Sequence, residues 1–175
     1  MQQPSQKTAS LLSTSLVSLS PANLILAAPG SDKTAVQYLQ GLAALAKDAA
    51  EDHACGSVLA GQGSEADDFG DIAFWLGTGK YDQDNANRVM DALGLDASQI
   101  RPVPLTHAGL PTAAFNPQIE GGEFIEELKR LGEKYCIRAS IPGEATVVFV
   151  LVGQYGNVGW GGLIGAGIWS DCLSD

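Results

Sequence analysis

The hydrophobic pattern is clearest in the C-terminal third of the chain. Between residues 123 and 133 the apolar side chains fall on one face of a helix, which predicts an amphipathic helix there. Three apolar runs follow, and a glycine-containing turn separates each run from the next. These runs are 135–141, 145–152 and 158–169, with turns at 142–143 and 153–157. The pattern therefore predicts one helix followed by a three-stranded antiparallel meander.

The N-terminal half has weaker periodicity that favours helices. Apolar positions partly follow a helical stripe over 33–52, after Asp32 as a helix N-cap. A second helix is expected over 67–76, with its end at Gly77 or Gly79. A third is expected over 85–93, capped by Asp82 or Asp84 and ended by Gly94. Short strands are expected at 23–28 and 100–105, the latter in a proline-bearing connection over 95–121.

Together these elements predict an α+β fold in which a helical N-terminal half packs on a small antiparallel C-terminal β-meander. Residues 23–175 are expected to form a single domain, since 175 residues suffice for one core. Residues 1–22 are interpreted either as a flexible segment or as a signal peptide. The leucine run of 7–28 favours a signal peptide, whereas its five serines and Pro21 oppose it, so the cytoplasm is favoured over secretion.

The stretch from Ala145 to Ser170 has 26 residues without a charged side chain. That length meets the crude criterion for a membrane-spanning helix. Seven glycines, together with Gln154 and Asn157, oppose a helix, whereas the β-branched run 145–152 has the length of one strand. Two buried strands are the better interpretation. Because such strands are apolar on both faces, helices or a partner must cover the second face of the sheet.

Composition narrows the classes of function. Ten basic and twenty acidic residues give a net charge of −10, which disfavours binding to nucleic acid or anionic lipid. An acidic surface of this kind suits either solubility or a basic protein partner, and a homo-oligomer stays open. The three cysteines are an odd number without a Cys-x-x-Cys pair, so neither a disulfide scaffold nor a zinc knuckle is expected.

Three segments imitate ligand-binding motifs and fail on their chemistry. Residues 27–34 resemble a phosphate-binding loop, but Ala27 and Asp32 replace its two glycines. Residues 61–66 match a loose dinucleotide pattern surrounded by carboxylates. Residues 82–93 begin like a calcium loop but end in Leu93 where a bidentate glutamate is needed. No cofactor and no metal are therefore predicted, although a cation site built from the aspartates of 67–71 and 82–84 is an alternative.

Catalysis has one candidate pair. Cys55 could act as a nucleophile with His107 as its base, which gives a small hydrolase-like enzyme as one alternative function. A secreted envelope or membrane-active protein is the other alternative.

The leading interpretation is a non-enzymatic binding or regulatory protein that engages a protein partner. Its contacts are expected from a glycine- and aromatic-rich C-terminal region and from acidic positions on the surface. These residues are Tyr155, Asn157, Trp160, Asp67, Asp68 and Asp71.

Overall fold

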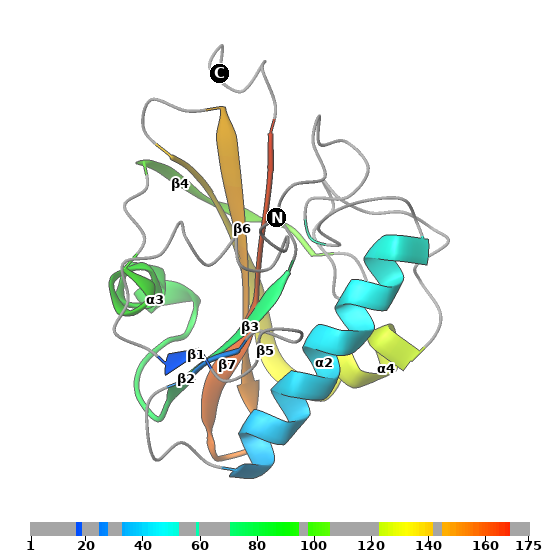
Figure 1. Ribbon diagram of the computed structural model, residues 1–175. Helices are drawn as coiled ribbons and strands as arrows, with labels where there is room; N and C mark the ends of the chain where they lie inside the picture. The colour runs from blue at the N-terminus through cyan, green and yellow to red at the C-terminus, as the bar shows by residue number, and fades with distance from the viewer. Residues whose placement is uncertain are drawn as a thin grey trace.

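The computed structural model describes residues 17–18, 25–27, 33–52, 59, 71–94, 98–105, 123–141 and 145–168. They form one β-sheet with helices on both of its faces (Figure 1). The α+β class is confirmed, and the three-stranded meander forms the centre of a larger sheet. The predictions for residues 1–16 and for the turn at 142–143 lie outside the described residues.

The sheet has seven strands in the order β1-β2-β3-β7-β6-β5-β4. In chain order the strands are β1 (Val17–Ser18), β2 (Ile25–Ala27), β3 (Ile72–Gly77), β4 (Ser98–Val103), β5 (Leu131–Ser140), β6 (Thr146–Tyr155) and β7 (Gly159–Ile168). Only β2 and β3 pair in parallel, and the other neighbours are antiparallel. Consecutive long strands therefore pair with each other, and β3 joins the meander through β7.

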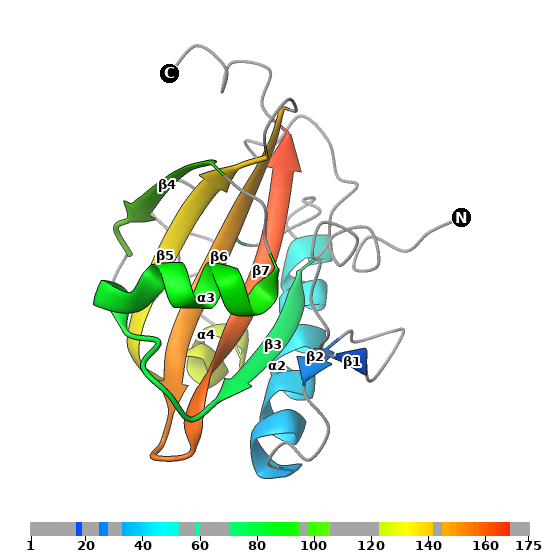
Figure 2. The same ribbon diagram turned by 90° about the vertical axis from the view of Figure 1, so that its left-hand side faces the viewer.

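Two helices lie on one face of the sheet and a third lies on the other (Figure 2). The first face carries α2 (Lys33–Asp52) and α4 (Glu123–Leu128), and the second carries α3 (Ala86–Leu93), which follows the short 3₁₀ helix η2 (Gln83–Asn85). Gly94 ends α3 with φ of 68°, as the sequence predicts. None of the described helices combines the length and hydropathy of a bilayer-spanning segment.

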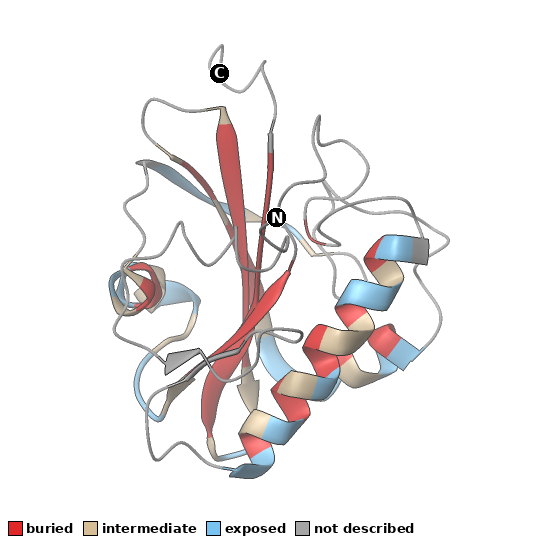
Figure 3. Ribbon diagram, in the orientation of Figure 1, coloured by how far each residue is buried: buried red, intermediate tan, exposed pale blue. Residues whose placement is uncertain are grey.

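Strand β6 shows why both faces need helices. Its side chains alternate between the two layers, so that Val147, Phe149 and Leu151 pack against α2 and α4, whereas Val148 and Val150 pack on the α3 side. All of these residues are buried, which makes β6 the centre of two apolar cores (Figure 3). The expectation that helices cover the second face is confirmed.

One element type and two boundaries were predicted wrongly. Residues 72–77 form strand β3 rather than the end of a helix, because this short run is apolar on both of its faces. Helix α4 ends at Leu128 because Leu131 already begins β5. The β6–β7 turn lies at 156–158, where Gly156 has φ of 53°, and not at 153–157.

The role predicted for Asp82 and Asp84 was also wrong. Asp82 precedes η2, but its side chain forms no capping bond to the backbone. The Asp82 carboxylate instead accepts a hydrogen bond from Asn85 Nδ2 at 2.5 Å. Asp84 lies in the first turn of η2, and α3 begins without a side-chain cap at Asn85.

Candidate functional site

The last residue of β6 meets the second turn of α2 at the surface. The Tyr155 ring stacks on the Tyr38 ring with a centroid distance of 4.6 Å and an interplanar angle of 22°. Tyr155 points to the α2 face because it ends a strand whose odd-numbered residues all face that layer. The contact therefore follows from the register of β6 and from the way α2 packs on the sheet.

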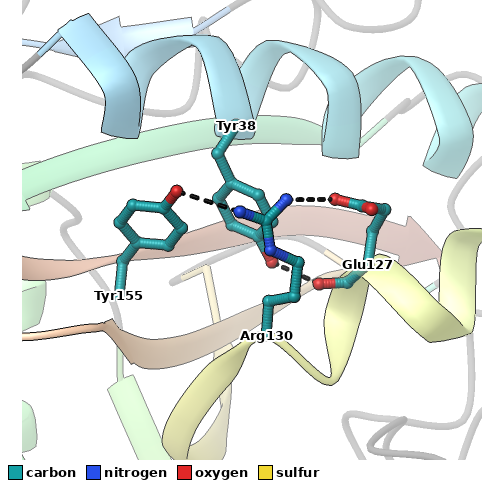
Figure 4. A network of polar contacts seen from close by, with 4 residues as sticks. All are labelled: Tyr38, Glu127, Arg130 and Tyr155. Carbon is teal, nitrogen blue, oxygen red and sulfur yellow. Dashed lines mark hydrogen bonds and ion pairs between the residues drawn. The ribbon is translucent and has the colours of Figure 1, made fainter.

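Arg130, which follows α4, completes this contact (Figure 4). Its guanidinium carbon lies 4.8 Å from the Tyr38 centroid and 5.7 Å from the Tyr155 centroid, within the range of cation–π attraction. Arg130 Nη2 donates to the Tyr155 hydroxyl at 3.1 Å, and Nη1 donates to Glu127 Oε2 at 3.0 Å. We call Tyr38, Glu127, Arg130 and Tyr155 the tyrosine–arginine cluster.

The Tyr38 hydroxyl ties the helices to each other. It donates at 2.5 Å to the backbone carbonyl of Glu127 near the end of α4, and the same carbonyl accepts the Arg130 N–H at 3.1 Å. Burial, followed by the Glu127 charge, raises the pKa of Tyr38 well above its usual value. The phenol is therefore a neutral donor at ordinary pH, and its role in the cluster is to hold α4 against α2.

The charged side chains of the cluster are accessible to solvent, whereas the Tyr38 ring beneath them is buried. Only 6% of Tyr38 is exposed, but the side chains of Arg130 and Glu127 are 51% and 37% exposed. The hydrogen bond to Glu127 is the main reason that the pKa of Arg130 is raised. The Arg130 guanidinium stays charged and the Tyr38 phenol stays protonated, so the cluster presents a fixed cation beside the Glu127 carboxylate and two phenol rings.

The sequence-predicted aromatic residues do not share one site. Tyr155 lies on the α2 face and Asn157 is exposed in the β6–β7 turn. Trp160 is only 6% exposed and packs on the α3 side, where its indole Nε1 donates to the Gly79 carbonyl at 3.1 Å. Tyr155 and Trp160, both predicted as partner contacts, therefore lie on opposite layers of the sheet and cannot form one contact surface together.

The glycines of β7 have a packing role. A Cβ atom on Gly161 would lie 2.6 Å from the Phe74 carbonyl oxygen, 2.8 Å from the Trp75 ring and 3.3 Å from Leu39 of α2. Glycine is needed here because the Trp75 side chain of β3 crosses over the β7 backbone. Gly161 therefore lies under neighbouring side chains, not at an open ligand site.

The acidic and catalytic candidates fall in different parts of the chain. Asp71 is buried, with 8% of its surface exposed, so the expectation of Asp71 as a surface contact was wrong. Cys55, His107, Asp67 and Asp68 lie outside the described residues. Within the described ranges, no three His, Cys, Asp or Glu side chains lie close enough to hold a metal ion.

Sequence reasoning found Tyr155 but missed its partners Tyr38, Glu127 and Arg130. The one signal in the sequence is that Tyr38 lies three residues after Ala35 and four before Leu42, on the buried stripe of α2. A scan against protein-family models and a search of curated proteins found no match to the chain.

Proposed function

We propose that the protein is a non-enzymatic binding protein that engages a protein partner through the tyrosine–arginine cluster and the adjoining β6–β7 turn. The observation that carries this proposal is the ordering of the cluster. Stacking, cation–π contact and hydrogen bonds fix Arg130 and Tyr155 before any partner arrives. Side chains that are already held in place lose less conformational entropy on binding.

The residue types also suit this role. Tyrosine and arginine are enriched among residues that dominate the energy of protein interfaces, because each offers a large flat surface together with polar groups. Here the exposed guanidinium and the Glu127 carboxylate give a partner both signs of charge beside an aromatic ring. Asn157 adds an exposed amide in the turn that follows β6.

The charge distribution changes the acidic part of the proposal. The described residues carry eleven Asp and Glu side chains and nine Lys and Arg side chains, a net charge of −2 out of −10 for the whole chain. Most of the acidic excess thus belongs to other segments, including Asp67 and Asp68. A basic surface on the partner would be attracted to those segments, while the cluster supplies the fixed contacts.

Site-specific photo-crosslinking tests this function. A benzophenone amino acid at Asn157 should crosslink a defined partner, while the same group at exposed Asp91 of α3, on the opposite side of the sheet, should not. The Arg130→Ala and Tyr155→Ala variants should weaken binding, and so lower the yield from position 157, by about thirty-fold, since an interface hot spot contributes about 2 kcal/mol or more. Arg88→Ala, a cation on α3, is the matched control and should leave the yield unchanged.

The outcomes separate the alternatives. A crosslink from position 157 to a second copy of the chain would identify the partner as the protein itself. Equal yields from positions 157 and 91, or yields that Arg130→Ala does not change, would refute the assignment of this surface.

A further inference from the structure

Two arginines lie directly opposite each other on the outermost strand pair of the sheet. Arg101 of edge strand β4 pairs with Arg138 of β5 in antiparallel register. Arg101 is exposed and Arg138 is half-buried. Both point to the α2 face. Arg138 pairs with Phe149, and Arg101 lies two residues before Val103 on the same face of β4. Phe149 and Val103 both belong to the apolar layer beneath α2 and α4.

An irregularity in β4 creates this pairing. Ser98 is opposite Ser140, so a regular ladder would put Arg101 opposite Ile137, on the α3 face of the sheet. The register instead shifts between Ser98 and Arg101, and Gln99 adopts the left-handed conformation with φ of 51°. The bulge therefore turns Arg101 to the same face as Arg138, at the cost of a strained backbone.

Two arginines placed opposite each other repel. Like charges directly opposite each other on neighbouring strands repel and destabilise a sheet. Among the residues that the structure describes, neither guanidinium forms an ion pair or a side-chain hydrogen bond. Two forked donors side by side match a group that carries several carboxylates.

The surroundings of the pair suit an extended peptide better than a small ion. Val103 and Leu105 follow Arg101 on the same face and are only partly buried against the apolar layer. A chain laid along β4 would meet the two guanidinium groups first and these apolar side chains next. The pair is therefore the charged end of a longer mixed surface.

We propose that the Arg101–Arg138 pair docks an acidic, extended segment of a partner protein on the α2 face of the sheet. Charge complementarity identifies the occupant, since carboxylates relieve the repulsion between the guanidinium groups. The segment lies on this face and does not extend the sheet as an eighth strand. Pro102 and Pro104 have no N–H groups to donate to an added strand. Because they are two residues apart, both missing donors fall on the same edge of β4.

A labelled octaglutamate peptide tests this docking on the full chain by fluorescence anisotropy. The protein should bind the peptide, and added salt should weaken the binding. Arg101→Gln and Arg138→Gln should each weaken it by about ten-fold, since a hydrogen bond to a charged group contributes on that order. Arg138→Lys keeps the charge but loses the fork, so its loss should be intermediate.

A matched control keeps the result specific. Arg88→Gln removes a charge from α3, on the other side of the sheet, and should bind octaglutamate as the natural sequence does. Circular dichroism of each variant checks that it folds. This docking is independent of the proposed cluster function, so either can fail without the other.

Four results would overturn the proposal. They are an absence of octaglutamate binding, an equal loss in Arg88→Gln, full displacement of the peptide by millimolar inorganic phosphate, and equally tight binding to phosphatidylserine vesicles. The third would indicate a small-anion site, and the fourth a membrane surface.

Discussion

At Gly161 a single hydrogen atom allows β7 to pass under the Trp75 ring. Any larger side chain would contact the Phe74 carbonyl oxygen at 2.6 Å, and backbone cannot move aside as a flexible side chain can. Gly41 on the exposed side of α2 is the opposite case, because a Cβ there has no neighbour within 4 Å. These two glycines make a matched pair for substitution.

Gly161→Ala should lower the free energy of unfolding by about 1–3 kcal/mol, the usual cost of overpacking a filled core. Gly41→Ala should raise it by about 0.5–1 kcal/mol, because alanine is the better helix former. Urea denaturation of the two variants measures both changes. A neutral Gly161→Ala would contradict the close packing of β7 against Trp75.

The sequence could not distinguish these roles of glycine. Seven glycines within 153–167 suggested an open surface for a ligand. What decides the role of Gly161 is its contact with Leu39 and Trp75, which lie far from it in the chain. Local sequence shows that a position is glycine but not which side chain lies over it.

Among the elements, those with clear periodicity were predicted well. Helices 33–52 and 86–93 are close to their predicted bounds, and the strand predicted over 145–152 was found but continues to Tyr155. Strand β3 was missed because Ile72–Gly77 is too short to show a period, and both of its faces are buried. Its pairing with β7 is long-range, so only the folded sheet decides that it is a strand.

The segment after β3 is held by side chains from two other strands. Trp160 of β7 donates to the Gly79 carbonyl at 3.1 Å, and the Tyr135 hydroxyl of β5 donates to the Tyr81 carbonyl. Trp160→Phe and Tyr135→Phe each remove one of these bonds while keeping a ring in the core. A typical net hydrogen bond contributes about 1 kcal/mol, which corresponds to a change in local opening of about five-fold.

Amide hydrogen exchange should therefore be about five-fold faster at residues 78–81 in each of these two variants, given that size of hydrogen bond. The amides in the middle of α2 serve as the internal control and should keep their exchange rates. If exchange rose equally in α2 and in the segment, the variants would have lowered global stability instead of releasing this segment.

In the whole molecule, contacts distant in sequence determine both the site and the core. The tyrosine–arginine cluster joins α2, α4 and β6, and Tyr38 lies 89 positions from the Glu127 carbonyl that it contacts. Tyr155 could be chosen from the sequence as an aromatic residue among glycines. Its partners could not, because no local sequence pattern indicates that Arg130 packs on the Tyr155 ring. The same holds for Arg101 and Arg138, which a single bulge aligns.

Burial of three weak acids in this two-sided core makes the protein sensitive to alkali. Burial is the main cause that raises the pKa of the Cys136 thiol from 9.0 to about 12, and it raises the pKa values of Tyr38 and Tyr135 above 10.0. Well below pH 9 these groups are protonated in both the folded and the unfolded chain, so they do not change stability with pH. Above pH 9 the unfolded chain releases protons that the folded chain retains, so the free energy of unfolding falls as the pH rises.

Each such group should lower the free energy of unfolding by about 1.4 kcal/mol for each pH unit between its unfolded and its folded pKa. Urea midpoints at pH 8, 9, 10 and 11 measure this dependence. Cys136→Ala is the control: it lowers stability at every pH through the lost side chain, but its stability should fall less steeply from pH 9 to 11. Parallel curves for the two proteins would contradict a buried, protonated Cys136. Because Cys136 lies beneath α2 and α4 and Tyr135 beneath α3, the alkaline transition reports on both layers of the sheet at once.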